Sequence, residues 1–211
     1  MNNNLKHLDL GCGLNPKNPY NSQYLYGIDI EPLDKAKMLS NFTIKEIKAR
    51  NLIFDQIPYK ENFFDSVSAY DFLEHIPRII SLSTKGKNQT RYAFIELMNE
   101  IYRTLKHKGK FYALTPYYPN AQAFQDPTHV NIITNLTHIY FCEPHLMAAM
   151  YGFNGKFKLI RSIPVRPKYT FEPIKLNMRQ YFRRLKDKIY QRESHLIWEF
   201  EAIKNYKKPV K

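Results

Sequence analysis

The sequence is poor in cysteine and has no long apolar run. Cys12 and Cys142 are its only cysteines, which excludes a disulfide-stabilised scaffold and is typical of proteins in a reducing compartment. No stretch approaches the roughly 20 apolar residues that cross a bilayer. Residues 1–4 also lack the basic and apolar regions of a signal peptide. We therefore expect a cytoplasmic protein without a transmembrane segment.

Acidic residues are scarce in the last quarter of the chain. Residues 156–211 hold 16 Lys and Arg against 5 Asp and Glu, whereas residues 1–155 hold 16 against 14. A basic region of this kind attracts nucleic acid, an anionic membrane or an acidic substrate. A generally basic proteome, or a need for solubility, explains the charge equally well. Charge alone therefore does not choose a partner.

Apolar residues are plentiful enough for one packed domain over residues 1–211. They make up 44% of the chain, and aromatic residues make up 15%. Their short runs predict strands at 5–10, 24–30, 42–49, 66–70, 110–115, 157–165 and 196–203. Spacings of three and four predict helices at 92–105 and 175–192. The alternation of strands and helices predicts an α/β domain with a mostly parallel sheet.

Polar and glycine-containing segments follow the predicted strands at the points where they end. These segments are 9–15, Asp29, 71–75 and the chain beyond Thr115. In a parallel sheet the carboxyl ends of the strands meet at one edge, where ligands bind. We therefore expect these segments to form a single crevice.

A glycine turn and an acid mark the first two strand ends. The turn is Gly11-Cys12-Gly13, and Asp29 ends the next strand, just before Ile30. Glycine lets the backbone approach a ligand closely, and a carboxylate in this position accepts hydrogen bonds from both hydroxyls of a ribose. No Gly-Lys-Ser/Thr sequence follows, which argues against a phosphate-binding NTPase loop. The pattern predicts a nucleoside site.

Five segments in this order resemble the class I S-adenosylmethionine (SAM)-dependent methyltransferases. Residues 8–16 (LDLGCGLNP) resemble the first motif of that family, and residues 26–30 (YGIDI) resemble the second. Residues 57–65 (IPYKENFFD) are similar to its LPFPDNSFD stretch, and residues 71–76 (DFLEHI) are similar to its LEHI segment. Residues 97–111 resemble the helix and turn before the fifth strand. The resemblance covers about residues 5–116.

The resemblance implies a fold and a set of cofactor contacts. The fold is a Rossmann-like three-layer sandwich with a mostly parallel seven-stranded sheet whose last strands are antiparallel. Residues 1–116 would bind SAM, 117–155 would face the substrate, and 156–211 would form a basic strand-helix-strand unit. The implied SAM-binding residues are Asp9, Gly11, Cys12, Gly13, Asp29, Ile30, Asn51, Asp55, Asp71 and Phe72. Asn51 and Asp55 are alternatives for the position that meets the adenine amine.

Candidates for the chemistry lie after the fifth strand. Residues 126–131 (DPTHVN) resemble a segment found in a subgroup of bacterial methyltransferases. A methyl acceptor such as an alcohol must lose a proton, and histidine titrates near neutral pH. We predict His129 as the base or substrate anchor, oriented by Asp126, with His75 as the alternative base. The competing interpretation is that Asp126 only caps a following turn.

A metal site is not expected from the sequence. His129, His138, Cys142 and His145 have spacings that match no standard zinc pattern, and no thiolate pair is present. Aromatic residues in this region are candidates for a wall of the substrate pocket, although ordinary core packing explains them equally well. They are Tyr117, Tyr118, Phe124, Tyr140 and Phe141.

Three functions compete. The first is transfer of a methyl group from SAM to an oxygen or nitrogen of a small molecule or glycan. The second is methylation of RNA or protein through the basic C-terminal region, and the third is a non-catalytic partner subunit with the same fold. The predicted helix at 175–192 allows a solvated face, a nucleic-acid contact, a membrane contact or a homodimer.

Overall fold

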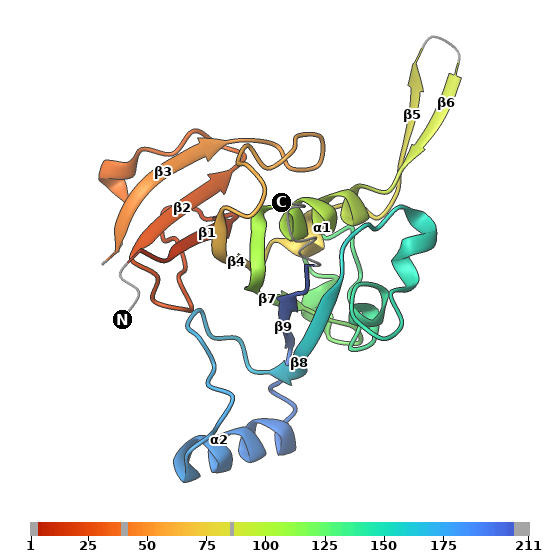
Figure 1. The fold of residues 1–211 in the computed structure, drawn as a ribbon. Coiled ribbons are helices and arrows are strands. Elements are labelled where there is room, and N and C mark those ends of the chain that lie inside the picture. The colour runs from red at the N-terminus through yellow and green to blue at the C-terminus, as the bar shows by residue number, and fades with distance from the viewer. Residues whose placement is uncertain (1–3, 39–41, 85–86, 205–211) are drawn as a thin grey trace, which may run out of the picture.

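Seven strands form one mixed sheet in the order β3-β2-β1-β4-β7-β9-β8 (Figure 1). The computed structural model describes residues 4–38, 42–84 and 87–204. The bounds are β1 Lys6–Leu10, β2 Tyr24–Asp29, β3 Thr43–Ala49, β4 Phe64–Tyr70, β7 Leu105–Pro116, β8 Phe157–Val165 and β9 His195–Ala202. Neighbouring strands from β3 to β7 are parallel, whereas β9 runs antiparallel to both β7 and β8. The predicted sheet and its antiparallel end are confirmed.

Alternation along the central strands builds a core on each face of the sheet. Val67 and Ala69 of β4 belong to the larger cluster, which also contains helix α1 (Ala93–Thr104). Tyr70 of β4 and Tyr112 of β7 belong to a smaller cluster on the opposite face. Side chains of a strand alternate between faces, so one strand supplies both clusters.

The outer layers contain fewer helices than the resemblance implies. The larger cluster is covered by α1 and by the 3-10 turns η4 (Thr137–Tyr140) and η5 (Met147–Tyr151), whereas loop residues Tyr20 and Phe171 pack on the smaller one. Residues 11–23 connect β1 to β2 without a helix. Proline lacks a backbone N–H and interrupts helices, and this connection contains Pro16 and Pro19.

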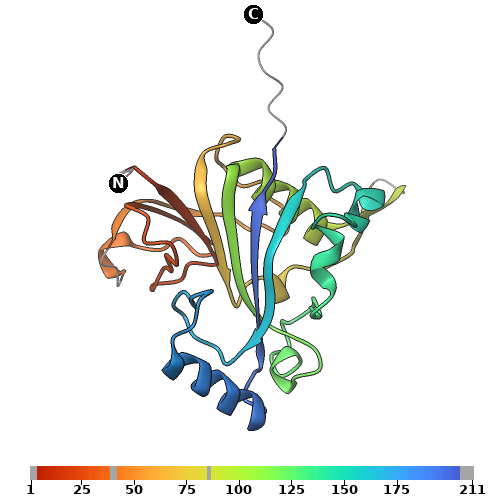
Figure 2. The ribbon, with the colours of Figure 1, turned by 60° about the horizontal axis from the view of Figure 1, so that its bottom comes forward.

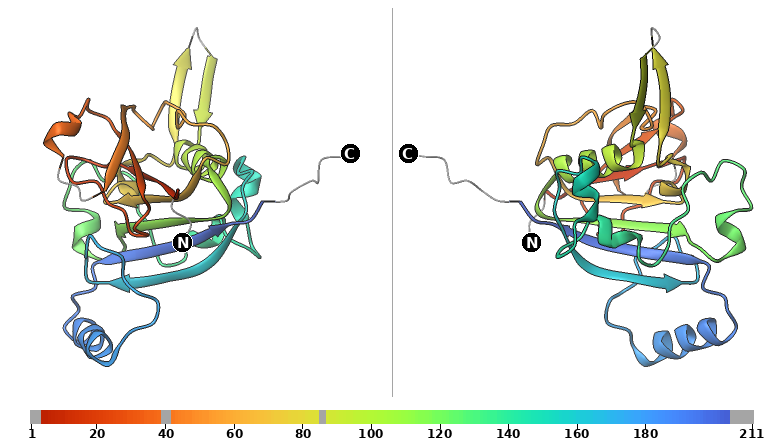
Figure 3. Two further views of the ribbon diagram at one scale, coloured as in Figure 1. Left: turned by 60° about the vertical axis from the view of Figure 1, so that its left-hand side comes forward. Right: turned by 90° about the vertical axis from the view of Figure 1, so that its right-hand side faces the viewer.

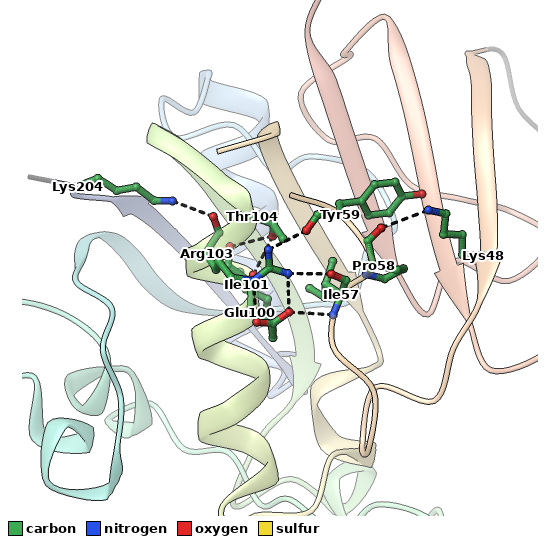
Figure 4. A network of polar contacts seen from close by, with 9 residues as sticks. All are labelled: Lys48, Ile57, Pro58, Tyr59, Glu100, Ile101, Arg103, Thr104 and Lys204. Atoms are coloured by element: carbon green, nitrogen blue, oxygen red, sulfur yellow. Dashed lines mark hydrogen bonds and ion pairs between the residues drawn. The ribbon is translucent and has the colours of Figure 1, made fainter. Parts of the chain in front are cut away.

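Helix α1 holds the connection between β3 and β4 through a charged pair at its C-terminal end (Figure 4). Glu100 Oε2 accepts a hydrogen bond from the Ile57 backbone N–H at 2.9 Å. Arg103 donates to the carbonyls of Ile57 and Tyr59 at 2.8 and 2.7 Å, and its guanidinium lies 2.7 Å from Glu100. These bonds hold the segment similar to LPFPDNSFD against the end of α1 that leads into β7.

Two parts of the chain project from this body. A hairpin of β5 (Ile80–Thr84) and β6 (Lys87–Arg91) extends beyond α1 (Figure 1) and was not predicted. Helix α2 (Met178–Ile189) stands at the edge where β8 ends and β9 begins (Figures 2 and 3). It confirms the predicted helix within 175–192. Across the described ranges, no helix combines the length and apolar composition needed to cross a bilayer.

Residues 117–155 leave the carboxyl end of β7 and return to the start of β8. A first part carries the 3-10 turn η3 (Ala121–Ala123) and remains near the carboxyl edge of the sheet. Further along, Phe141 and Phe153 are buried in the larger core cluster. Phe141 packs edge-on against Phe94 of α1, with ring centroids 5.4 Å apart. Phe141 therefore packs in the core, and together with Tyr140 it also lines a cavity beside α1.

Candidate functional site

The glycine turn follows β1 and lies against the segment that follows β4. Gly11 and Gly13 have φ values of +66° and +51°, in the left-handed region that favours glycine. A Cβ on Gly11 would lie 2.7 Å from Phe72 Cδ2, so the phenyl ring occupies the space that any other side chain would need. Two of the segments expected to converge therefore touch at Gly11 and Phe72.

Asp9 is buried beneath this turn and holds the chain that follows it. Its Oδ1 accepts a hydrogen bond from Ser68 Oγ at 2.5 Å, and its Oδ2 accepts one from the Lys17 backbone N–H at 2.7 Å. Burial raises the pKa of Asp9 to about 7. Both carboxylate oxygens thus have partners within the protein, which makes Asp9 a positioning residue for the turn. Its direct contact with SAM stays a prediction.

A buried histidine extends this polar arrangement across β1 and β4. The His7 ring lies between Ser66 Oγ and Ser68 Oγ, at 2.7 and 2.8 Å. Burial lowers the pKa of His7 to about 3, so the ring is neutral. Sequence analysis did not identify His7. The only sign of it in the sequence is that His7 lies two positions before Asp9, so that both side chains point to the same face of β1.

The ends of β2 and β3 lie beside the same turn. Asp29 Oδ2 accepts a hydrogen bond from the Gly13 backbone N–H at 2.9 Å, and Asp29 O accepts one from Arg50 N at 2.8 Å. Asn51 N donates to Asp55 Oδ2 at 3.1 Å, so these two candidates belong to one turn. Ile30 is exposed and Cys12 is buried, where burial raises the pKa of its thiol to about 12.

Asp71 begins the segment after β4 in a left-handed conformation, with φ of +46°. Its backbone N–H donates to Leu114 O at 2.8 Å, which ties the end of β4 to β7. Its Oδ1 lies 3.1 Å from Nε2 of His195, the first residue of β9. Asp71 therefore links the segment after β4 to the start of β9. Contact of Asp71 and Phe72 with the sulfonium stays a prediction.

A cluster of polar side chains begins two residues beyond Phe72. Glu74 and His75 sit in the 3-10 turn η2 (Leu73–His75), and His129 comes from the segment after β7. His129 Nε2 is 4.0 Å from both Glu74 Oε1 and Asp126 Oδ2. The backbone secures this approach, because Glu74 O accepts hydrogen bonds from the N–H groups of residues 130 and 131, both at 2.9 Å.

The carboxylates of the cluster have different environments. Glu74 is 1% exposed, and burial raises its pKa to about 8, although Thr115 Oγ1 donates to its Oε2 at 2.9 Å. Asp126 is exposed to solvent, and hydrogen bonds from Thr128 lower its pKa. Burial lowers the pKa of His75. His129 therefore lies beside two carboxyl groups whose pKa values are shifted in opposite directions, upward for Glu74 and downward for Asp126.

The comparisons with known proteins identify the family. A family model described as a methyltransferase domain matches residues 8–113, half of the chain. The chain belongs to the class I SAM-dependent methyltransferases. Its seven-stranded sheet is that of the methyltransferase fold, and SAM is its cofactor. Contact of the glycine turn and Asp29 with SAM stays a prediction. The comparison with curated proteins finds no match.

Solved structures share the methyltransferase fold at low sequence identity. A chain from the complex of the Haloferax volcanii Trm112 methyltransferase activator with a methyltransferase has a TM-score of 0.56 and 14% identity, over 95% of this chain and 83% of that one. A protein from Listeria monocytogenes described as a SAM-dependent methyltransferase gives 0.54 and 15%, over 97% and 94%. Haemonchus contortus phosphoethanolamine N-methyltransferase 1, solved with phosphoethanolamine and S-adenosylhomocysteine, gives 0.54 and 10%, over 97% and 40%.

The residues of the methyltransferase site fit SAM. Gly11 is exposed, so its backbone is open to a ligand, and Phe72 packs against the side where a Cβ would stand. Asp29 is half-buried at the end of β2, where its carboxylate can still accept hydrogen bonds from ribose hydroxyls. When bound, SAM supplies an activated methyl group. This chain must position the acceptor and handle its proton.

Sequence analysis did not single out Glu74, and it considered a metal group only on His129, His138, Cys142 and His145. Glu74 was read only as part of the LEHI segment, although its glutamate-histidine pair was a visible signal. Among the described residues, only Glu74, His75 and His129 bring metal-binding atoms together, all within 4.8 Å of one another. No three of His129, His138, Cys142 and His145 form such a group there. His138 Nδ1 instead contacts Asn135 O at 2.8 Å.

Proposed function

We propose that this methyltransferase transfers the methyl group of SAM to an oxygen or nitrogen of a small molecule or glycan. The observation that supports this most directly is the cluster of Glu74, His129 and Asp126 on the segment whose Phe72 touches the glycine turn. An acceptor held there lies between a methyl donor and a group that can accept its proton. An alcohol or an ammonium needs such a group.

In the proposed reaction, the acceptor gains one methyl group and loses one proton. The acceptor's oxygen or nitrogen forms the new bond to the methyl carbon as the bond from that carbon to sulfur breaks. The acceptor proton passes to His129, and S-adenosylhomocysteine leaves as the second product. Asp126 Oδ2 lies 4.0 Å from His129 Nε2, close enough to orient the imidazole.

A polar hollow at the same edge favours an acceptor with hydroxyl or anionic groups. It is lined by residues after β7, after β8 and before β9, including Asn120, Gln122, Arg166 and Arg192. Guanidinium and amide groups donate hydrogen bonds to sugar hydroxyls and to phosphate or carboxylate oxygens. Tyr118 and Phe124, half-exposed and edge-on at 6.3 Å, flank this region.

Methylation of RNA or protein is the main competing function, and a non-catalytic partner role is the other. The basic C-terminal region supports the RNA function, but two of its arginines bind within the protein. Arg183 contacts Glu172 at 3.2 Å, and Arg184 donates to Pro164 O at 3.1 Å. Binding that falls steeply with salt would favour RNA over a small acceptor.

Calorimetric titration of SAM and S-adenosylhomocysteine tests the cofactor site. Wild type should bind both, Asp29→Ala should lose binding, and Asp29→Asn should be intermediate because its amide oxygen still accepts from Gly13 N–H. Glu31→Ala, two residues further on the exposed side, is the matched control and should bind as wild type does. Equal binding by Asp29→Ala and wild type would refute the assigned site.

An acceptor screen then tests the chemistry. Sugars, hydroxylated metabolites and amines are incubated with SAM, and each mixture is analysed for a product heavier by one methylene. His129→Gln should bind SAM normally and form product at least ~100-fold more slowly, the lower end of the usual range for a general base. Methylation of RNA or protein, with none of small acceptors, would contradict the proposal.

A further inference from the structure

Glu74, His75 and His129 place a carboxylate and two imidazoles around one point. Their ligand atoms all lie within 4.8 Å of one another. The two rings meet edge to face, with centroids 4.8 Å apart. We propose that these three side chains bind a divalent transition-metal ion.

The buried carboxylate has an oxygen with nothing to bind. Glu74 Oε2 accepts from Thr115, but Oε1 is buried and has no hydrogen-bond partner in the described structure. A buried carboxylate oxygen is costly unless it is hydrogen-bonded, protonated or coordinated to a metal. Oε1 lies 4.0 Å from His129 Nε2, so Nε2 is the atom of that ring placed to share an ion with it. An ion bound at this point would give Oε1 the partner that it lacks.

The surroundings of His75 fix which of its nitrogens is available. The Thr128 hydroxyl donates to Asp126 Oδ1 at 2.7 Å, so it cannot also donate to His75. His75 Nδ1, 2.9 Å from the same hydroxyl oxygen, must then be the donor. Its Nε2 is left with a free lone pair. A histidine whose second nitrogen is held by a carboxylate-linked partner is the usual arrangement of a metal ligand.

The donor set selects the class of ion. Two imidazole nitrogens and one carboxylate oxygen suit Zn²⁺, Mn²⁺, Fe²⁺ or Co²⁺, whereas Mg²⁺ and Ca²⁺ prefer oxygen ligands throughout. Three protein ligands leave positions open for an acceptor oxygen, whose pKa the ion would lower. This consequence rests on the proposed function, but the binding of the ion does not. With His129 bound to the ion, Asp126 would take the acceptor proton in its place, since it lies outside the ligand set and next to His129.

Metal titration of the full chain after chelation and gel filtration tests the site. Zn²⁺ and Mn²⁺ are titrated by calorimetry, and Co²⁺ by its visible absorption, in each case without SAM or acceptor. Wild type should bind one ion per chain, with Glu74→Gln and His129→Gln weaker by ~100-fold and Thr128→Val weaker by about 10-fold. His145→Gln, an exposed histidine outside the group, should bind as wild type does.

The outcomes separate this proposal from the proposed function. SAM binding by each variant reports that it is folded, and exposed Thr128 provides a test if a buried substitution prevents folding. Wild type that binds SAM but takes up no metal would overturn the metal site alone. Uptake that Glu74→Gln, His129→Gln and Thr128→Val leave unchanged would do so too. Metal uptake by a protein that methylates no small acceptor would overturn only the proposed function.

Helix α2 carries a second, independent inference because its apolar side faces solvent. Met178, Phe182 and Ile189 are 70%, 59% and 67% exposed, and Leu185 lies between them on the same side. The opposite side faces the protein through charged groups. Asp187 is buried, with its backbone carbonyl accepting from Arg192 N–H at 2.8 Å, and Arg184 donates to Pro164 O. The apolar stripe therefore lacks a partner within the described chain.

Basic residues border this stripe on both sides. With 100° between successive residues, Arg179 and Lys186 fall on one flank and Lys188 on the other. An apolar stripe between rows of lysine and arginine is the pattern of a helix that lies in a membrane interface. We infer that α2 seats the protein on an anionic membrane surface.

Charge argues against the other occupants. A second copy of the chain docked through this face by a two-fold axis would bring equal rows of cations together. Nucleic acid would satisfy the cations but would leave the aliphatic groups of Met178, Leu185 and Ile189 in water. An anionic bilayer satisfies both, because its headgroups meet the cations and its acyl boundary meets the stripe.

Co-sedimentation of the full chain with vesicles tests this surface. Vesicles of phosphatidylglycerol and phosphatidylcholine should retain wild type at least ~10-fold more strongly than phosphatidylcholine alone, since each basic residue contributes about 1 kcal/mol. Phe182→Ser with Ile189→Ser, and separately Lys186→Gln with Lys188→Gln, should each lose this preference. Met150→Ser, exposed but remote from α2, is the control. Equal sedimentation of all variants, or a stripe-dependent dimer by ultracentrifugation, would overturn the inference.

Discussion

Gly11 and Gly13 share a left-handed backbone but differ in what surrounds them. A Cβ on Gly11 would meet Phe72 at 2.7 Å, whereas one on Gly13 would meet no atom within 4 Å. The left-handed conformation costs a residue with a Cβ about 1–2 kcal/mol, and a forced contact adds about 1–3 kcal/mol. The two positions therefore separate backbone strain from collision with the neighbouring segment.

Gly11→Ala should lower the free energy of unfolding by about 2–5 kcal/mol and weaken SAM binding more than Gly13→Ala does. Gly13→Ala should lose only about 1–2 kcal/mol, since space is open there. Urea unfolding and calorimetric titration measure the two effects. Equal losses in both variants would show that Phe72 does not constrain the turn.

The raised pKa of Glu74 makes the free energy of unfolding depend on pH, and the direction of the pKa shift decides the sign. Its pKa is raised from 4.5 to about 8, so the folded protein holds this proton more tightly than the unfolded chain does. The resulting stabilisation is complete below pH 4.5 and is lost as the pH rises through 8. Asp9, whose pKa is raised to about 7, acts in the same direction.

Glu74→Gln should remove the contribution of this residue and leave that of Asp9. Relative to wild type, the metal-free variant should therefore be more stable at pH 8 than at pH 5, by a few kcal/mol at most, since a tenfold change in proton affinity is worth about 1.4 kcal/mol. Urea unfolding in a chelator at both pH values provides the measurement. The same difference between the two proteins at both pH values would rule out a raised pKa.

At the scale of elements, the sequence predicted what short-range patterns control. Dense apolar runs located the seven strands, and one stripe of Phe94, Leu97 and Ile101 located α1. The hairpin of β5 and β6 was missed because serine, threonine and asparagine dominate it and only Ile80 and Leu82 alternate. The seven-stranded sheet with its antiparallel end was expected only from the family resemblance, since periodicity does not determine which strands pair.

The candidate site could be predicted only in part for the same reason. Strand ends placed Gly11, Asp29 and Asp71 at one edge, and the structure confirms that their segments meet. The approach of His129 to Glu74 joins residues 55 positions apart through backbone hydrogen bonds to Glu74 O, which no local pattern reveals. The sequence also did not predict that the apolar stripe of α2 faces solvent, because an amphipathic pattern does not say which side of a helix faces the protein.

At the scale of the whole molecule, one buried network joins the cofactor loop to the last strands. Glu199 of β9 is 3% exposed and lies 2.7 Å from Arg161 of β8. Its other oxygen accepts from the Tyr20 hydroxyl at 2.9 Å, at the end of the connection that begins with the glycine turn. Arg161 also donates to Glu172 O, which lies near the base of α2 at 5% exposure. The segment before α2 and the connection that carries the glycine turn therefore contact the same ion pair, Arg161–Glu199.

Glu199→Ala should lower the free energy of unfolding by about 3–5 kcal/mol, because it leaves the buried Arg161 guanidinium without its counter-ion. Tyr20→Phe removes one hydrogen bond, keeps the ion pair, and should cost only about 1 kcal/mol. Because Tyr20 anchors the connection that carries the glycine turn, both variants should also weaken SAM binding. Thermal unfolding with and without SAM measures both effects. If Tyr20→Phe bound SAM as tightly as wild type, the network would stabilise the sheet without positioning the cofactor loop.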